Sequence, residues 1–349
     1  MPEVLDIRHL ETFFAEAQDV CIVVHTHPDG DALGSGVALL EYLRRCRGKR
    51  AMLLLPDPAA QYLRFLLPAD GWLAASEATQ EAVRAVATSD LVICLDMNGF
   101  GRAGCLEQAL RGSRARKLLI DHHQGPERAS FDLVFSETEI SSASELLYQV
   151  LLALPGVGAA EHLPLEVLTP LMAGMTSDTN NFGNSVYPST LRMAADLLAA
   201  GVDRDALVAA FYHNYRENRF RAMGRFLQEM RMTPDGVAYA VLRRSFLGEF
   251  ALQEGETEGF VNLPLGIAGV RLSVFLREDD GHFRVSLRSK PGVSARRLAA
   301  EAFHGGGHEC AAGGKLYFPD DIAAPELAAA YIETMTARFM RNPAPSDKD

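Results

Sequence analysis

The chain has 349 residues, of which 48% are hydrophobic and 23% charged, and its formal net charge is −11 at pH 7. This length and composition are typical of a globular protein with room for two hydrophobic cores. The acidity argues against a grip on long duplex DNA through many phosphates, and it favours short anionic ligands held by a few cations and metal ions.

Cysteine usage and apolar patterning indicate a cellular compartment. The five cysteines are scattered, odd in number and form no CxxC pair, which is typical of thiols in a reducing compartment. No apolar run reaches the roughly 18 residues needed to cross a bilayer. The first residues, Met1 to Asp6, lack the layout of a signal peptide. We therefore expect a cytoplasmic protein without a membrane partner, and we leave a homodimer open.

Short apolar runs alternate with helical patterns through the first half of the chain. The runs predict strands over Val20–His25, Arg50–Leu55, Leu91–Asp96 and Lys117–Asp121. The helical patterns cover Leu33–Arg47, Gly104–Arg111, Ser142–Leu152 and Leu165–Met175. Nearly continuous Val, Ile and Leu strands between helices are typical of a parallel sheet covered on both faces. We predict an α/β domain over residues 1–200.

The second half begins with a long helical pattern over Arg204–Met230. We expect residues 201–232 to be a helical connector between two domains. Thr233-Pro234-Asp235-Gly236 is a turn signal, and strand patterns return afterwards at Val237–Leu242, Val270–Leu276 and Phe283–Leu287. This predicts a smaller α+β domain over residues 233–341. The proline-rich, polar residues 342–349 predict a tail.

Acidic residues and histidines follow the ends of three predicted strands. In open α/β sheets, ligands gather outside the carboxyl ends of the strands, so we expect these side chains at one edge. Another aspartate follows the last predicted helix of this half. Four carboxylates offset the charge of two divalent cations, and imidazole completes a suitable ligand set. The candidate metal ligands are His25, Asp29, Asp31, Asp96, His122 and Asp178.

Each of these side chains also has a structural interpretation. Asp29 or Asp31 could cap the helix expected from Leu33, and one of the two adjacent histidines could satisfy buried polar groups. The convergence of six such residues favours the metal site. Mixed carboxylate and imidazole ligands suit two Mn²⁺ ions, with Fe²⁺, Co²⁺ or Mg²⁺ as alternatives.

The motifs resemble those of the DHH phosphoesterases, a family named for the tripeptide found here at Asp121-His122-His123. The segment from His25 to Asp31, HTHPDGD, is similar to the first motif of the family, Asp96 to its second and Asp178 to its fourth. In the fourth motif Asn180 stands where the family has glycine, which leaves the shape of that loop open.

The resemblance implies a role for each motif residue. It implies one ion on His25, Asp29 and Asp96, and the other on Asp31, Asp96, His122 and Asp178. Asp96 would bridge the two ions. The resemblance also implies that His123 is catalytic and donates to the phosphoryl oxygens or the leaving group, and that Asp121 supports this histidine.

A glycine-rich segment in the second half is similar to the signature of the DHH-associated domain. Consecutive glycines let backbone N–H groups approach an anion. Arginine can clamp a phosphate in bidentate fashion, and one arginine after the third strand resembles a family residue near the substrate phosphate. The structural alternatives are a flexible loop and solvent-exposed cations. The candidate substrate-binding residues are Arg102, Arg288, Lys290, Gly305, Gly306, Gly307 and His308.

Size and domain plan select a branch of this family. The chain is too short for RecJ-type exonucleases, and its second half does not resemble family II pyrophosphatases. The resemblance to the nanoRNase and pAp-phosphatase branch implies hydrolysis of short RNA or DNA oligonucleotides to mononucleotides and of 3′-phosphoadenosine 5′-phosphate (pAp) to AMP. Two alternatives stay open: a phosphodiesterase for cyclic di-AMP or pApA, and a nucleotide sensor with slow hydrolysis.

Overall fold

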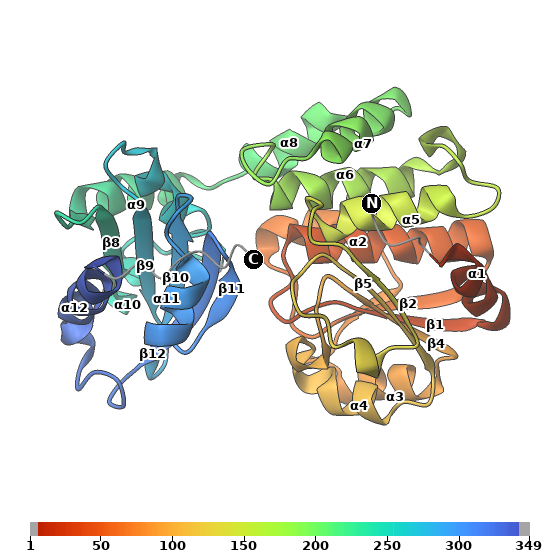
Figure 1. Ribbon diagram of the computed structural model, residues 1–349, viewed down its shortest axis with the longest axis horizontal. Coiled ribbons are helices and arrows are strands. Elements are labelled where there is room, and N and C mark those ends of the chain that lie inside the picture. The colour runs from red at the N-terminus through yellow and green to blue at the C-terminus, as the bar shows by residue number, and fades with distance from the viewer. Residues whose placement is uncertain (1–5, 254, 342–349) are drawn as a thin grey trace. The chain divides into compact units, whose positions relative to one another are not determined.

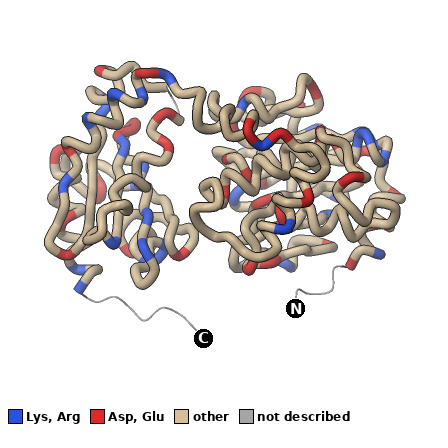
Figure 2. The backbone as a smooth tube through the Cα atoms, turned by 90° about the horizontal axis from the view of Figure 1, so that it is seen from above, with Lys and Arg blue, Asp and Glu red and all other residues tan. Residues whose placement is uncertain are grey.

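The computed structural model describes residues 6–253 and 255–341. The chain forms two compact units, Met1–Asn214 and Tyr215–Asp349, which are drawn in Figure 1. Over the described ranges, no helix combines the length and apolarity needed to cross a membrane. Acidic and basic residues are interspersed along the backbone of each unit, as Figure 2 shows.

The first unit is built on a fully parallel sheet. The strand order is β3-β2-β1-β4-β5-β6, so the chain runs outward from β1 in one direction and then returns to β4 on its other side. Ligands of such sheets bind at this reversal point, at the carboxyl ends of the strands. The strands are β1 (Asp19–Val23), β2 (Arg50–Leu55), β3 (Trp72–Ala74), β4 (Leu91–Leu95), β5 (Arg116–Asp121) and β6 (Leu133–Ser136).

Helices cover both faces of this sheet (Figure 1). The strands are buried on both sides, which explains their continuous Val, Ile and Leu runs. The core on one face includes α1 (Ile7–Glu16), α2 (Gly30–Glu41), α5 (Ala143–Ala153) and α6 (Leu165–Asp178), with α7 (Pro188–Ala199) and α8 (Arg204–Tyr212) outside them. The other face carries α3 (Thr79–Thr88) and α4 (Glu107–Gly112).

Close packing of α2 against α6 brings two predicted ligands together. A Cβ at Gly34 of α2 would lie 2.5 Å from the carbonyl oxygen of Pro170 in α6, so only glycine allows this approach. Asp31 lies in the first turn of α2, and Asp178 is the last residue of α6. The glycine contact therefore positions helix ends that belong to the candidate site.

The second unit contains a mixed sheet with the order β11-β12-β10-β9-β8-β7, in which β8 and β9 are parallel and the other pairs antiparallel. One face packs on α11 (Ala295–Ala302) and α12 (Ala328–Arg341), and the other on α9 (Glu217–Glu229) and α10 (Arg244–Glu249). The strands are β7 (Arg231–Met232), β8 (Val237–Leu242), β9 (Leu272–Glu278), β10 (His282–Ser289), β11 (Gly306–His308) and β12 (Ala311–Tyr317). The predicted fold class, an α/β unit followed by a smaller α+β unit, is confirmed.

The prediction of a single helix over Arg204–Met230 is wrong. The chain forms α8 and α9 there, and Arg216 between them is extended, with φ −70° and ψ 151°. Its guanidinium donates to Glu256 (2.7 and 2.5 Å) and to the carbonyl oxygen of Ala251 (2.8 Å). These contacts hold Arg216 outside a helix, at the boundary between the two units. The connector proposed over residues 201–232 thus contains two helices and β7.

Candidate metal centre

The predicted metal ligands lie together at the carboxyl edge of the parallel sheet. They form two groups that share one carboxylate. His25 and Asp29 belong to the first group, and Asp31 and His122 to the second, with Asp96 common to both. Asp178 adjoins the second group, because its Oδ2 is 3.3 Å from His122 Nε2.

Asp96 occupies the centre of this arrangement, directly after β4. Its Oδ2 lies 3.4 Å from His25 Nε2, and its Oδ1 lies 3.3 Å from His122 Nε2. The side chain is 2% exposed, and its backbone is left-handed, with φ +55°. Aspartate tolerates this conformation better than most residues. The two oxygens of Asp96 thus face two different imidazoles, as a bridging ligand requires.

The ring of His25 presents a buried nitrogen to two carboxylates. Its Nδ1 lies 2.8 Å from the carbonyl oxygen of Thr26, which fixes Nδ1 as the protonated nitrogen. Within the described residues, Nε2 is buried and has no hydrogen-bond partner. A cation between this nitrogen and the oxygens of Asp29 and Asp96 would satisfy all three groups, so the donor set fits a metal ion.

The electrostatics of the site favour positive charge. Burial alone would lower the pKa of His25, but Asp29 and Asp96 outweigh it and raise this pKa to about 10. Burial acts on His122 in the same way, while Asp96, Asp178 and Asp31 raise its pKa to about 10. The clustered carboxylates therefore hold protons on both imidazoles. Divalent cations compensate the same negative charge.

The two aspartates of the first motif have different backbone partners. Asp29 caps α2, since Oδ1 accepts from the N–H groups of Asp31 (3.0 Å) and Ala32 (3.1 Å). The structural interpretation thus holds for Asp29, and the helix begins at Gly30. Asp31 does not cap its own helix. It accepts instead from Ala143 N–H (2.6 Å) and Ser144 N–H (2.9 Å), at the start of α5.

Burial and charge repulsion raise the pKa values of Asp31 and Asp178, the two aspartates at helix ends. Burial first, and then Asp96, raises the pKa of Asp31 to about 7. Burial and the neighbouring Asp31 also raise the pKa of Asp178 well above its ordinary value. Two neighbouring carboxylates repel each other, so keeping both of them ionised costs free energy unless a cation lies between them. This pair therefore adds to the case for a metal ion beside His122.

The backbone after Asp178 shows how asparagine can occupy a position where the fourth motif has glycine. Asn180 stands where the family has glycine, and its φ is +46°. Asparagine enters this left-handed region far more readily than most residues other than glycine. The hydroxyl of Thr179 accepts from Phe182 N–H at 3.0 Å and supports the turn. The substitution is therefore compatible with a glycine-like backbone path.

The predicted catalytic residues form a hydrogen-bonded row with Arg102. His123 Nδ1 lies 2.7 Å from Asp121 Oδ1, and His123 Nε2 lies 3.0 Å from Arg102 Nη1. A guanidinium only donates, so Nε2 accepts from Arg102 and Nδ1 carries the proton given to Asp121. Arg102 Nη1 also lies 3.4 Å from the carbonyl oxygen of Asp96. The structure thus places this row beside the shared carboxylate.

The predicted cations of the second unit lie near the end of β10. Arg288 is half-buried, and burial lowers its pKa. The β-sheet register pairs it with Ala311, which is paired in turn with His308. Directly paired residues point to the same face, so Arg288 and His308 share one face of this sheet. Lys290 Nζ donates to the carbonyl oxygen of Ile267 at 2.9 Å.

The glycine-rich segment forms the edge strand β11 and its approach to β12. A Cβ at Gly305 would lie 1.9 Å from the carbonyl oxygen of Gly313, and one at Gly307, where φ is +141°, would lie 2.6 Å from that of Ala311. Among the described residues, nothing lies within 4 Å of a Cβ at Gly306. Packing therefore explains two of the three glycines, and the third has no local structural requirement.

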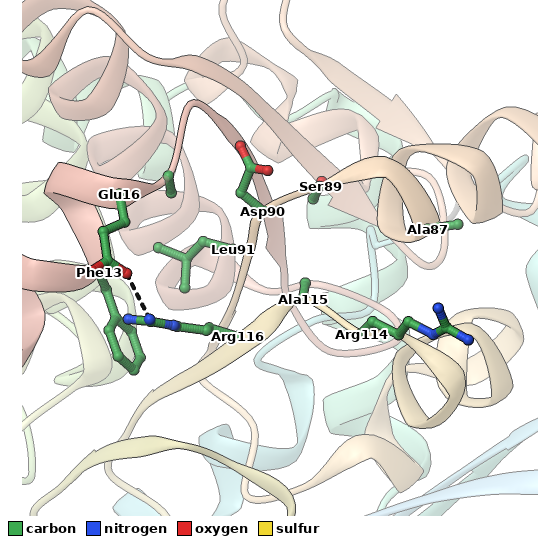
Figure 3. A pocket seen from close by; sticks show the side chains of 10 residues that line it. Phe13, Glu16, Ala87, Ser89, Asp90, Leu91, Arg114, Ala115 and Arg116 are labelled. Carbon is green, nitrogen blue, oxygen red and sulfur yellow. Dashed lines mark ion pairs between the residues drawn. The ribbon is translucent and has the colours of Figure 1, made fainter.

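A hollow at the amino ends of β4 and β5 lies opposite the candidate site (Figure 3). Three of its charged residues, Glu16, Asp90 and Arg116, already have partners. Arg116 pairs with Glu16 at 2.6 Å and stacks over Phe13, and Asp90 accepts from the N–H groups of Gln18 and Asp19. These contacts tie α1 to the sheet, and among the described residues the groups of candidate metal ligands lie at the carboxyl edge and not in this hollow.

Sequence reasoning missed the partners that orient Asp31. The segment from Ser141 to Glu145 carries the signal of a helix start, and Ser142 does cap α5 by accepting from Glu145 N–H at 3.0 Å. That signal predicts where the helix begins. It does not predict the hydrogen bond from Ala143 N–H to Asp31, because Asp31 lies 112 positions earlier in the chain. Only the fold brings these groups together.

Comparison with known proteins identifies the family. Residues 19–175 match the DHH family, N-terminal domain, and residues 235–336 match the DHHA1 domain. The bifunctional oligoribonuclease and PAP phosphatase NrnA of Thermus thermophilus is 30% identical over 323 residues, 91% of this chain and 90% of the relative. NrnA of Bacillus subtilis is 28% identical over 322 residues, 90% of this chain and 94% of the relative. The crystal structure of an exopolyphosphatase-related protein from Bacteroides fragilis superposes with a TM-score of 0.89 at 32% identity, and covers 96% of both chains. The chain therefore belongs to the DHH family, as its motifs predicted, with a DHH domain followed by a DHHA1 domain.

Proposed function

We propose that this chain is a two-metal phosphoesterase that hydrolyses short oligonucleotides to mononucleotides and pAp to AMP. The observation that carries the proposal is the position of Asp96, whose two oxygens face His25 and His122 at the reversal point of the parallel sheet. The names of the two NrnA relatives supply the substrates. Both relatives match over nearly their whole length, so the comparison covers the site and both domains.

The residues present fit two divalent cations. His25, Asp29 and Asp96 would hold one, and Asp31, Asp96, His122 and Asp178 the other. When bound, two such ions polarise the phosphoryl oxygens and lower the pKa of an attacking water. DHH phosphoesterases depend on divalent metals, and we propose Mn²⁺ because the ligands are carboxylate and imidazole without thiolate. Fe²⁺, Co²⁺ and Mg²⁺ accept the same ligands.

We propose that Arg102 and His123 contact the phosphate that reacts. The guanidinium can donate two hydrogen bonds to phosphoryl oxygens, and its shift toward them would release His123 Nε2. Asp121 keeps hold of Nδ1 and so orients the ring, and Nε2 would have to carry a proton before it could donate to the same oxygens or the leaving group. In the second unit we assign a further phosphate of the substrate to Arg288, His308 and the exposed backbone of Gly306, with Lys290 beside them.

A hydrolysis panel tests this function. We expect Mn²⁺ to support rapid turnover of pAp and a five-nucleotide RNA, with little turnover of a long single strand, and we expect chelation by EDTA to stop it. Preference for cyclic di-AMP or pApA would place the chain among dinucleotide phosphodiesterases. Tight pAp binding without product would make it a sensor. We keep a cytoplasmic location as part of the proposal, and size-exclusion chromatography with light scattering tests the homodimer.

Two glycine substitutions separate folding from substrate binding in the second unit. Gly305→Ala should lower the free energy of unfolding by about 2 kcal/mol, because its Cβ meets the carbonyl oxygen of Gly313. Gly306→Ala should leave thermal unfolding unchanged but raise the KM for pAp, if the exposed backbone approaches a phosphate. An unchanged KM for Gly306→Ala would remove this segment from the substrate site.

A further inference from the structure

Two loops of the candidate site are joined by a residue that lies outside every motif. Asp96 and Arg102 belong to the loop after β4, and His122 and His123 to the loop after β5. Glu127, further along the second loop, donates its backbone N–H to the carbonyl oxygen of Asn98 at 2.7 Å. The Asn98 side chain returns a hydrogen bond to the carbonyl oxygen of Gln124 at 3.1 Å.

The carboxylate of Glu127 makes a second connection between the loops. Its Oε2 accepts from Phe100 N–H at 3.3 Å, at the start of the 3₁₀ turn that carries Arg102. A Cβ at Gly99 would lie 2.7 Å from this oxygen, so glycine there lets the carboxylate reach the backbone. The turn then closes through Arg102 N–H and the carbonyl oxygen of Gly99, at 3.2 Å.

The other oxygen of Glu127 is anchored on the outer side. Its Oε1 accepts from Arg111 Nη1 at 2.8 Å and from the hydroxyl of Ser130 at 2.7 Å. These two groups, Arg111 first, lower the pKa of Glu127, so it is ionised at neutral pH. The guanidinium of Arg111 also lies over the buried ring of Phe100, 5.4 Å from its centroid. The carboxylate is therefore fixed at both ends.

The contacts of Glu127 fix the position of the turn from which the Arg102 side chain reaches His123. The backbone of Arg102 is held on its far side by Thr26 N–H, which donates to its carbonyl oxygen at 2.8 Å. With the turn fixed by Glu127, the guanidinium meets His123 at 3.0 Å. The carboxylate of Glu127 contacts Phe100 N–H, Arg111 and Ser130, so its effect on Arg102 passes through the turn.

We propose that Glu127 is a positioning residue that holds Arg102 against His123 and the phosphate of the substrate. This inference rests on the proposed role of Arg102 in phosphate binding. A misplaced guanidinium weakens its charge-assisted hydrogen bonds to phosphate. Loss of Glu127 should therefore raise the KM for pAp more than it lowers kcat. The loss should have this effect only in a chain that still contains Arg102.

A double-mutant cycle between Glu127 and Arg102 tests the proposal. Glu127→Ala in the full chain should raise the KM for pAp about tenfold, but change it by less than about twofold in an Arg102→Ala background. Glu107→Ala is the matched control. It removes the other carboxylate on Arg111, at 2.9 Å, and leaves the Glu127 contact with Phe100 in place, so the KM should stay near that of the unmodified chain.

Two outcomes would overturn the inference. Equal effects of Glu127→Ala in both backgrounds would mean that it does not act through Arg102, and so would a lower melting temperature with an unchanged KM. If the alanine variant does not fold, Glu127→Gln has nearly the same volume and takes its place in the cycle. Titration of pAp in Ca²⁺ repeats the cycle without turnover, so a chain that binds but does not hydrolyse pAp would refute the proposed function alone.

Discussion

Replacement of Asp96 by asparagine should lower kcat for pAp by roughly 10³-fold, about 4 kcal/mol of barrier, while the chain remains folded. The carboxylate is the only side chain that both groups of candidate ligands share among the described residues. Asparagine fits the left-handed backbone at this position, where φ is +55°, and it keeps the size of the side chain. What it removes is the second anionic oxygen that a bridging ligand needs.

The measurement combines initial rates in Mn²⁺ with metal analysis of the purified protein. Asp132→Asn is a suitable control, because the Asp132 carboxylate accepts from Lys117 N–H at 2.7 Å at the amino end of β5, away from the site. The control should keep full metal content and activity. Near-normal turnover by Asp96→Asn would show that the two-metal assignment is wrong, whereas lost activity with a lost circular dichroism spectrum would call for Asp96→Glu instead.

The sequence could predict that the candidate ligands lie together, because strand ends are local features. Strands β4 and β5 lead directly into an aspartate or histidine, β1 does so after Val24, and the parallel topology then brings those ends to one edge. The short β3 and β6 were missed, since strands of three or four residues leave little periodicity to read. The six ligand candidates did not depend on them.

Contacts between distant segments could not be predicted in the same way. The carboxylate of Asp31 is oriented by backbone N–H groups of α5, and Glu127 joins two loops through a main-chain N–H. Every residue except proline carries a backbone N–H group, so the sequence pattern does not show which of these groups will donate to a distant carboxylate. The role of the glycine-rich segment could not be read from the sequence for a related reason, because close backbone neighbours require glycine at Gly305 and Gly307 whether or not a ligand binds there.

Gly174→Ala should show how strongly helix packing controls the metal site. A Cβ at this position of α6 would lie 1.9 Å from the Ser144 hydroxyl and 2.7 Å from Asp31 Oδ1. The helix interior cannot widen without moving α5 or α2, so we expect a loss of about 3 kcal/mol in the free energy of unfolding. Displacement of the Asp31 carboxylate should also lower activity by about tenfold or more in the fraction that folds.

Chemical denaturation of the metal-free chain, together with Mn²⁺ titration, separates the two effects. Adding Ser144→Ala removes the hydroxyl at 1.9 Å and should restore part of the stability, but not the activity, since the contact with Asp31 remains. Gly112→Ala is the matched control, because it lies at the end of α4 with no described atom within 4 Å, and it should stabilise slightly. Equal losses in both glycine variants would show that the cost comes from glycine replacement in general. Recovery of activity together with stability would show that Asp31 is not displaced, and that the close approach of α2, α5 and α6 serves folding alone.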